Sequence, residues 1–186
     1  EFPELGDLQD RTLMEVGCGV GNLVFPVLES NPQCQIIAAD FSQNAINVLV
    51  KDSRFACNRV QAVVHDFTAG PLHDHHSDMA TLIFVLSAVP PEKHVLFISN
   101  VLKSTNKILF RDYAVEDAAQ KRFSENNKIS DELFVRQDGT LTYFFSIEYL
   151  EKVASESGAI IENPQYINSE TVNFKEDLRV HRRFLQ

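Results

Sequence analysis

Short apolar runs alternate with amphipathic segments along the first 110 residues of the chain. Runs of about four to eight apolar residues between polar turns are typical of buried strands, and apolar positions spaced three or four apart are typical of helices. Because strands alternate with helices, the pattern indicates a parallel sheet covered by helices. It predicts strands at residues 12–16, 35–39, 60–64, 79–86 and 107–110, and helices at 22–29, 43–51 and 91–103.

The pattern changes after residue 110. Residues 114–132 are polar and are expected to be helical in their first half, and residues 134–145 predict a hairpin around the turn at 137–140. Ser146 and Gly158 are suited to begin and end one more helix. Strand-like runs at 159–163 and 180–185 complete the pattern. We expect one doubly wound α/β domain over residues 1–186, with a mostly parallel, seven-stranded, Rossmann-like sheet and an antiparallel last strand.

Composition excludes some classes of protein. The chain has 186 residues, of which 44 % are hydrophobic, as in an ordinary globular domain. No apolar stretch reaches the length of about 18 residues that a membrane helix needs, and no secretory signal is visible. Cys18, Cys34 and Cys57 are odd in number and lack C-x-x-C spacing, so they are expected to be reduced thiols in an intracellular, cytoplasmic protein.

The formal charge of −9 argues against simple electrostatic capture of nucleic acid. The charge is unevenly distributed, however, because 12 of the 17 lysines and arginines lie in residues 101–186. This distribution favours a polyanionic substrate that contacts the C-terminal part alone.

Residues 13–22, L-M-E-V-G-C-G-V-G-N, predict a nucleotide site. An apolar strand leads into a turn with three alternate glycines and then into a helix, and glycine lets the backbone approach a ligand closely. An ordinary strand–turn–helix connection would need only one or two glycines. The site would include Glu15, Gly17, Cys18, Gly19, Gly21 and Asn22, with Cys18 contributing its backbone and not a nucleophile.

The spacing of the glycines narrows the ligand. A dinucleotide fingerprint, G-x-G-x-x-G, would need glycine at position 22, where this chain has asparagine. An acid at Glu15 would repel a pyrophosphate and suits a cationic ligand. The E-x-G-x-G-x-G-N pattern resembles the first motif of methyltransferases that use S-adenosylmethionine, which carries an ammonium and a sulfonium group.

Two further acidic residues, Asp40 and Asp66, lie at or just after the ends of predicted strands. Asp40, followed by Phe41, ends the second strand, where nucleotide-binding units hold ribose hydroxyls. Asp40 could instead cap the next helix, but Ser42 is better placed to do so. Asp66 and Phe67 repeat the arrangement after the third strand, where they could contact an adenine, although an ordinary loop aspartate is the alternative.

The segment 73–78, H-D-H-H-S-D, superficially resembles a metal site. Its histidines lack the spacing of a helical ligand pair, and no fourth ligand is evident. We interpret it as a solvated loop, and the sequence predicts no metal.

Four later blocks carry a more specific resemblance: residues 82–89 (L-I-F-V-L-S-A-V), 109–113 (L-F-R-D-Y), 134–145 (F-V-R-Q-D-G-T and Y-F-F) and 170–173 (E-T-V-N). Together with the closing R-x-F-L-Q, they resemble the tRNA 3-methylcytidine methyltransferases over nearly the whole chain. The resemblance implies the methyltransferase form of the Rossmann-like fold. It also implies methylation of N3 of cytosine 32 in the tRNA anticodon loop, with S-adenosylmethionine as cofactor and S-adenosylhomocysteine as product.

The resemblance also assigns roles to residues. The cofactor would be lined by Gly17, Gly19, Gly21, Asp40, Asp66, Phe67 and Ile83. We include Phe41 in this set because it follows Asp40 directly. The substrate would be faced by Arg111, Asp112, Tyr113, Arg136, Asp138 and Tyr143. Phe84, near the end of the strand at 79–86, and Ser87, directly after it, lie where such sheets bind their ligands. Phe84, Tyr113 and Tyr143 offer surfaces for a cytosine that has left its stack.

Neutral cytosine N3 has a free lone pair, so its methylation needs no general base to remove a proton first. The product ring is cationic, and a carboxylate near the ring would stabilise that charge. Asp112 and Asp138 are the candidates, with Arg111 beside the first. Structural roles compete, since Asp138 suits a Q-D-G turn and Arg111 could pair with Asp112.

Two departures from the family are visible. Residues 104–106 are Ser-Thr-Asn where the family has Pro-Gly, and only about a dozen residues precede the glycine motif, so the family's N-terminal RNA-binding segment is expected to be absent. Some members of the family act with an aminoacyl-tRNA synthetase such as seryl-tRNA synthetase, which is therefore an expected partner. A small-molecule methyltransferase and a non-catalytic binding subunit are the alternatives.

Overall fold

The computed structural model describes residues 2–173 and 178–186. Its main sheet has seven strands in the order β3-β2-β1-β4-β5-β9-β8. β1 pairs in parallel with β2 and β4, and β2 pairs in parallel with β3, whereas β9 runs antiparallel to both β5 and β8. The predicted Rossmann-like sheet is therefore confirmed. The strands are β1 (Thr12–Val16), β2 (Gln35–Asp40), β3 (Val60–Val64), β4 (Met79–Ile83), β5 (Ile108–Tyr113), β8 (Tyr166–Asn173) and β9 (Leu178–Leu185).

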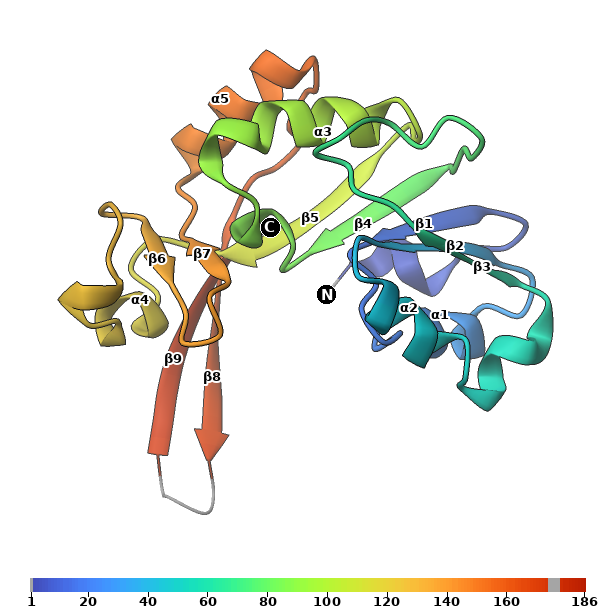
Figure 1. The fold of residues 1–186 in the computed structure, drawn as a ribbon, viewed down its shortest axis with the longest axis horizontal. Helices are drawn as coiled ribbons and strands as arrows, with labels where there is room; N and C mark the ends of the chain where they lie inside the picture. The colour runs from blue at the N-terminus through green and yellow to red at the C-terminus, as the bar shows by residue number, and fades with distance from the viewer. Residues whose placement is uncertain (1, 174–177) are drawn as a thin grey trace. The chain divides into compact units, whose positions relative to one another are not determined.

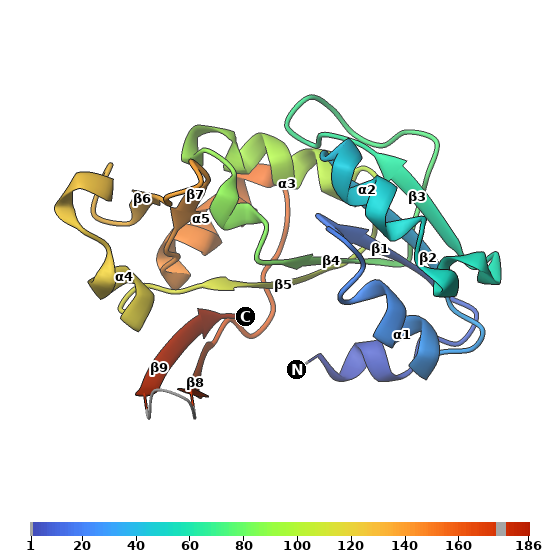
Figure 2. The same ribbon diagram turned by 60° about the horizontal axis from the view of Figure 1, so that its bottom comes forward.

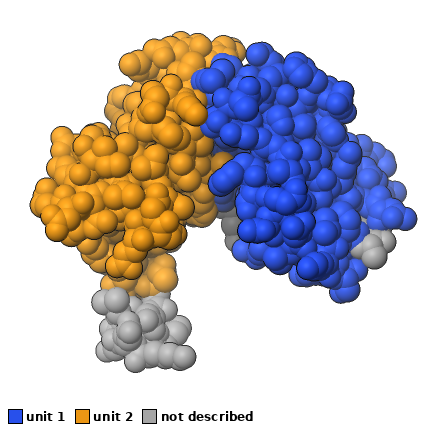
Figure 3. Space-filling model, in the orientation of Figure 1, with its two compact units in different colours: residues 1–83, 96–109 blue, residues 84–95, 110–186 orange. Residues whose placement is uncertain are grey.

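The chain divides into two compact units (Figure 3). Unit 1 comprises residues 1–83 and 96–109, and unit 2 comprises residues 84–95 and 110–186. Each unit is discontinuous in sequence, because the chain crosses from one to the other at residues 83–84, 95–96 and 109–110.

Unit 1 is built on the parallel strands. β1 is buried over Leu13–Val16 because its neighbours β2 and β4 both carry apolar runs. The helices α1 (Val24–Ser30) and α2 (Gln43–Leu49) contribute side chains to the same core cluster. Figure 1 labels both helices. In Figure 2, α1 and α3 (His94–Leu102) lie on opposite faces of the strands. A short 3₁₀ helix, η1 (Pro3–Gly6), packs on α1, and η2 (Ser53–Cys57) follows α2.

Several predicted boundaries in this region are shifted, and two of the shifts have a clear cause. The first helix begins at Val24 and not at residue 22, because the glycine turn continues through residue 23. β4 ends at Ile83, three residues early. Phe84 has a φ of +56°, which a strand cannot contain, and the apolar residues after it form the 3₁₀ helix η3 (Leu86–Ala88), followed by η4 (Pro91–Lys93).

Unit 2 contains the long ribbon of β8 and β9, which Figure 1 shows in red. Its best predicted element is α5 (Ile147–Ser157). The Ser146 hydroxyl accepts a hydrogen bond from the amide of Tyr149, and Gly158 ends the helix with a φ of +81°. Both capping residues were expected from the sequence.

The strand predicted at residues 159–163 does not form. Ile160 is 92 % exposed, and Pro164, which lacks an amide hydrogen, follows the segment directly. The strand lies later, at β8, where eight residues pair with β9. A fully paired polar strand is thus favoured over a short apolar one without a partner.

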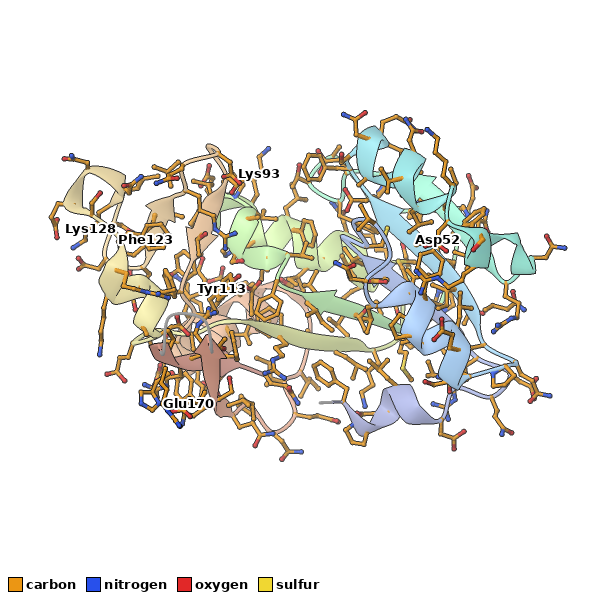
Figure 4. All side chains as sticks on the ribbon, turned by 90° about the horizontal axis from the view of Figure 1, so that it is seen from below. Asp52, Lys93, Tyr113, Phe123, Lys128 and Glu170 are labelled. Carbon is orange, nitrogen blue, oxygen red and sulfur yellow. The ribbon has the colours of Figure 1, made fainter. Side chains whose placement is uncertain are left out.

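The remaining elements of unit 2 form a small layer. β6 (Leu133–Val135) and β7 (Leu141–Tyr143) make the predicted hairpin, and α4 (Ala118–Arg122) and η5 (Glu125–Asn127) precede it. Phe123, labelled in Figure 4, stacks on Phe134 at 4.8 Å between ring centroids and so attaches α4 to the hairpin. Among the described residues, no helix is long and apolar enough to cross a membrane.

Candidate active site

The glycine turn of unit 1 needs its glycines for two different reasons. Gly17, Gly19 and Gly21 have φ values of +70°, +54° and +93°, which residues with a side chain rarely adopt. A Cβ at Gly21 would also lie 2.5 Å from the Phe25 ring, whereas a Cβ at Gly19 would meet nothing within 4 Å. Gly19 therefore leaves open space beside the turn, and Gly21 allows α1 to pack against it.

The turn is tied to the end of β2. The amides of Gly17 and Cys18 donate to the carbonyl of Ala39 at 2.8 and 3.1 Å. The Gly19 amide donates to Asp40 Oδ2 at 2.8 Å, and the Ser42 amide donates to Asp40 Oδ1, also at 2.8 Å. Ser42, and not Asp40, accepts the capping hydrogen bond of α2 from the Ala45 amide. Asp40 thus holds the turn, and each of its oxygens keeps a second lone pair for a ligand.

Glu15 is the least compensated group of the turn. It is 8 % exposed, and its Oε2 atom is buried without a hydrogen-bond partner. Burial raises the pKa of Glu15 to about 8, and the negative charge of Asp40 adds to the effect. A cationic ligand beside Glu15 would supply the missing partner and favour the ionised carboxylate. The ammonium and sulfonium groups of S-adenosylmethionine fit this requirement, whereas a pyrophosphate does not.

The other predicted cofactor residues lie at the same carboxyl edge of the parallel strands. Asp66 follows β3, accepts a hydrogen bond from the Thr68 amide at 2.8 Å and precedes the buried Phe67, whose ring packs against His65 and Phe97. Ile83 ends β4 and is half-buried. Phe41 is 78 % exposed beside Asp40, and Asn22 is exposed next to Gly21. Burial raises the pKa of the Cys18 thiol to about 12, so the neutral thiol is strongly favoured over the thiolate.

Unit 2 carries a cluster of three aromatic rings, Phe84, Tyr113 and Phe184, which we call the aromatic triad. Phe84 lies 5.0 Å from Tyr113 and 5.3 Å from Phe184 between ring centroids. The triad includes Tyr113 at the end of β5 (labelled in Figure 4), because β5 and β9 place Tyr113 directly opposite Phe184. Phe84 is 40 % exposed despite its size. A partly exposed aromatic cluster of this kind can stack on a flat ring.

Three arginines lie over the triad. The Arg111 guanidinium is 4.8 Å from the centre of the Phe184 ring, and the Arg136 guanidinium is 5.5 Å from that of Tyr113. Arg182 lies over both rings, at 5.2 and 5.5 Å. The arrangement combines stacking surface with positive charge, which is what an RNA base and its phosphate require.

Asp112 lies between Arg111 and Tyr113 in β5 and is fully buried. Its Oδ2 accepts from the amide of Ser87 and its Oδ1 from the amide of Tyr113, both at 2.9 Å. Burial raises the pKa of Asp112 to about 6, although the amide hydrogen bonds and the charge of Arg136 oppose the increase. The group is therefore mostly ionised at neutral pH. Arg111 does not pair with it but contacts Gln186 at 3.5 Å.

Asp138, Tyr143 and Arg136 all make contacts that hold the local structure of unit 2 together. Asp138 accepts from the amide and the hydroxyl of Thr140 at 3.0 and 2.7 Å, which lowers the pKa of Asp138 and makes it a turn residue. Tyr143 is 7 % exposed and packs on His94 and Tyr149. Arg136 donates through Nε to the Thr142 hydroxyl at 2.5 Å.

Sequence reasoning assigned no role to Phe184, Arg182 or Asp117. Asp117 is completely buried and accepts from Arg182 Nε at 3.0 and 3.2 Å and from the Arg183 amide at 2.6 Å. This contact fixes Arg182 beside the triad. The closing R-x-F-L-Q block contains both Arg182 and Phe184. The family resemblance of this block was therefore visible in the sequence, but it did not indicate what the two side chains do.

The histidine-rich loop shows no metal geometry. Across residues 2–173 and 178–186, no group of three histidine, cysteine or acidic side chains could hold a metal ion. Cys18 and Cys34 are buried free thiols, and the side chain of Cys57 lies outside the described part of the structure.

Comparison with known proteins identifies relatives over the whole chain. Residues 14–109 match a family described as a methyltransferase domain. The chain is 43 % identical to the tRNA N(3)-cytidine methyltransferase METTL6 of Rattus norvegicus, over 100 % of this chain and 69 % of the rat protein. It is 40 % identical to the tRNA N(3)-methylcytidine methyltransferase trm141 of Schizosaccharomyces pombe, over 98 % of this chain and 77 % of the yeast protein.

A solved structure shows the same fold at low identity. The crystal structure of a SAM-dependent methyltransferase from Methanosarcina mazei superposes with a TM-score of 0.76 and 15 % identity, and the match covers 100 % of this chain and 95 % of the other. At this level of identity the likeness concerns the fold alone.

Proposed function

Because this chain belongs to the family of tRNA N(3)-cytidine methyltransferases, we propose that it methylates N3 of a cytosine in tRNA with S-adenosylmethionine as the donor. We place the target at position 32 of the anticodon loop. The observation that carries the proposal is the 43 % identity to the rat enzyme, which extends over 100 % of the chain and so includes the residues of both units.

The donor belongs to unit 1. Bound S-adenosylmethionine supplies a methyl group activated by its sulfonium. Glu15 would hold the cationic part of the donor, since its buried Oε2 atom has no other partner. Asp40 would bind the ribose hydroxyls through its free lone pairs, and Gly19 leaves the space for close approach. Asp66 and Ile83, at the same edge of the strands, would contact the adenine.

The acceptor belongs to unit 2. The target base would stack on the aromatic triad, where Phe84 already exposes part of its ring. Arg111, Arg136 and Arg182 would contact the phosphates on either side, and their charge would balance the carboxylates of an acidic chain. Tyr143 is too buried to stack and would support the site from beneath.

Charge stabilisation is assigned to Asp112. The neutral cytosine ring gains a positive charge as N3 is methylated, and a fixed carboxylate lowers the energy of that charge without having to reorient. Asp112 is ionised near neutral pH and rigidly held by two amides. Asp138 is the weaker candidate, because its oxygen already closes the turn with Thr140.

Two finer parts of the proposal concern cellular context. An aminoacyl-tRNA synthetase such as seryl-tRNA synthetase would present the tRNA, which would reduce the number of phosphate contacts that this acidic chain must make itself. A cytoplasmic location fits the buried free thiols of Cys18 and Cys34.

The proposal is tested by incubating the protein with total tRNA and S-adenosylmethionine and analysing the nucleosides by mass spectrometry. We expect 3-methylcytidine in the digest, and we expect none when cytosine 32 of a transcribed tRNA is replaced by uracil. The reaction should be repeated with a seryl-tRNA synthetase present.

A matched variant distinguishes methylation by this protein from methylation by a contaminating enzyme. Gly19→Val forces a branched side chain onto a φ of +54° and into the open space of the turn, so it should abolish the signal. Methylation of a small molecule with no tRNA product under any of these conditions would overturn the assignment.

A further inference from the structure

A chain of hydrogen bonds crosses the interior of unit 2. It joins Tyr143 of β7, Tyr149 of α5 and His94 at the start of α3 to the backbone carbonyl of Val89. His94 is fully buried, with Nδ1 3.1 Å from the Tyr149 hydroxyl and Nε2 2.9 Å from the Val89 oxygen. The hydroxyls of Tyr143 and Tyr149 bond to each other.

The direction of every bond in this chain is determined. A carbonyl can only accept, so His94 Nε2 must carry the proton that it donates to Val89. Nδ1 of the neutral ring is then an acceptor, and the Tyr149 hydroxyl donates a hydrogen bond to it. The Tyr149 oxygen in turn accepts from Tyr143. Burial lowers the pKa of His94, which favours this neutral tautomer.

The carbonyl at the end of the chain belongs to a turn at the acceptor site. Residues 86–89, which we call the 86–89 turn, comprise η3 and Val89. Near its other end the Ser87 amide donates to Asp112, and three residues earlier the Phe84 amide donates to the carbonyl of Arg111 at 2.8 Å. The turn is therefore fixed from two directions, by Asp112 and by His94.

Packing alone does not require a histidine here. The rings of Tyr143, Phe145 and Tyr149 surround His94 at 5.4 to 5.8 Å between centroids, so a leucine or phenylalanine would be in an equally apolar site. A buried polar group is costly unless it is fully hydrogen-bonded, and a satisfied chain of such groups favours one geometry. Two contacts distinguish histidine from an apolar residue, the bonds to Tyr149 and to Val89, and the bond to Val89 is the one that reaches the 86–89 turn.

We propose that His94 is a positioning residue for the methyl acceptor: by donating to Val89 it holds the 86–89 turn against Asp112, and thereby places the Phe84 ring within the aromatic triad. The inference rests on the proposed function of unit 2. It adds a residue that touches neither substrate nor donor but sets where the target base stacks.

The test compares His94→Gln with His94→Leu in the full chain. The glutamine amide can donate to Val89 as Nε2 does and can accept from Tyr149, whereas leucine can do neither. We expect His94→Leu to lower kcat/KM for tRNA about tenfold or more, because small errors in position are costly. His94→Gln should recover most of this loss. The dissociation constant for S-adenosylmethionine should stay within about twofold in both, since the donor residues lie in unit 1.

A second pair of variants controls for general destabilisation. Tyr149→Phe removes the hydroxyl that fixes the His94 tautomer, and we expect an intermediate loss of about threefold in kcat/KM. Tyr166→Phe also removes one hydroxyl that contacts α5, at the Ile147 amide, but it does not touch the chain that ends at Val89. It should lower the melting temperature without changing kcat/KM.

The outcomes distinguish this inference from the proposed function. If the wild-type protein makes no 3-methylcytidine, the proposed function fails, and hydrogen exchange then decides the inference. The amides of residues 87–89 should exchange faster in His94→Leu than in His94→Gln. Unchanged exchange, or a folded His94→Leu variant with wild-type kcat/KM, would overturn the positioning role.

Discussion

Two buried carboxylates, Glu15 and Asp112, differ in how their charge is compensated. Asp112 accepts two amide hydrogen bonds and has a pKa of about 6, whereas Glu15 has an unpartnered oxygen and a pKa of about 8. Near neutral pH, Asp112 is therefore mostly charged and Glu15 mostly neutral. The difference in pKa follows from hydrogen bonding and from the neighbouring charges, Asp40 beside Glu15 and Arg136 near Asp112, and not from burial alone, because both carboxylates are deeply buried.

The raised pKa of Glu15 predicts how stability depends on pH. The folded chain binds a proton at Glu15 between the ordinary value of 4.5 and about 8, whereas the unfolded chain does not, so stability falls as pH rises through this window. The slope contributed by this group is at most about 1.4 kcal/mol per pH unit. Glu15→Gln, which resembles the neutral acid, should remove that slope when unfolding by urea is measured between pH 6 and 8.5.

The same variant should bind the donor differently. A cationic ligand favours ionised Glu15, so wild-type affinity for S-adenosylmethionine should increase from pH 6 to 8, with release of a proton, whereas Glu15→Gln should bind more weakly and independently of pH. Calorimetry in buffers of different ionisation enthalpy measures both quantities. Equal affinities for the two proteins would remove Glu15 from the donor site.

Asp112→Asn tests charge stabilisation. Losing one preorganised charge typically costs about 3 kcal/mol, or roughly a hundredfold in kcat. Wild-type kcat should also decline as pH falls through about 6, when Asp112 gains its proton, and the variant should lack that decline. Single-turnover methylation on saturating tRNA, with donor affinity measured alongside, gives these values.

The asparagine amide also faces one of the two backbone N–H groups that Asp112 binds, so some stability will be lost and assays belong well below the melting temperature. Asp138→Asn is the matched control at an exposed turn and should retain near-normal kcat. Normal single-turnover rates in Asp112→Asn would show that Asp112 does not stabilise the charge of the methylated ring.

At the scale of the elements, prediction succeeded where local signals agreed. β1, β3 and the caps of α5 were correct because apolar runs and capping residues pointed to the same boundaries. It failed at residues 159–163, where an apolar run has no strand partner, and at the end of β4, where Phe84 has a positive φ that apolar periodicity does not reveal. Tertiary pairing decided the first case, and a backbone conformation that a strand cannot contain decided the second.

Asp117 connects two elements of unit 2. It caps α4 through the Ala119 amide and holds Arg182 and the Arg183 amide on β9. Asp117→Ala leaves the largely buried Arg182 without its partner and should reduce the free energy of unfolding by about 3 kcal/mol. Glu116→Ala, which breaks a neighbouring but exposed ion pair with Arg183, should cost about 0.5 kcal/mol or less. Urea unfolding of the two variants measures the difference, and equal losses would contradict the role of Asp117.

At the scale of the whole molecule, the donor residues could be predicted because the carboxyl ends of parallel strands share one edge of a sheet. The acceptor residues were only partly predictable. Tyr113 and Phe184 are neighbours solely because β5 pairs with β9. No local sequence pattern predicts a strand pairing between residues so far apart in sequence. The division into two units was also invisible to periodicity.

The uneven charge of the chain predicts a specific salt dependence. If Arg182 contacts a phosphate, Arg182→Gln should weaken tRNA binding and reduce the slope of log K against log salt by about 1. Lys107→Gln removes a positive charge from unit 1, where Lys107 pairs with Glu4, and should leave the slope unchanged. Filter binding at several salt concentrations checks both, and identical slopes would place Arg182 outside the interface.

The discontinuity of the two units has a consequence for synthesis on the ribosome, where the chain emerges from its N-terminus. Unit 1 cannot be completed until residues 96–109 have appeared, and residues 84–95 must wait for the partners that 110–186 provide. His94 emerges long before Tyr143 and Tyr149, so its hydrogen bond to the Tyr149 hydroxyl cannot form until α5 has been made. Nascent chains halted before residue 143 should therefore acquire the donor fold first, and the ability to hold the acceptor should arise only after residues 110–186 have been made.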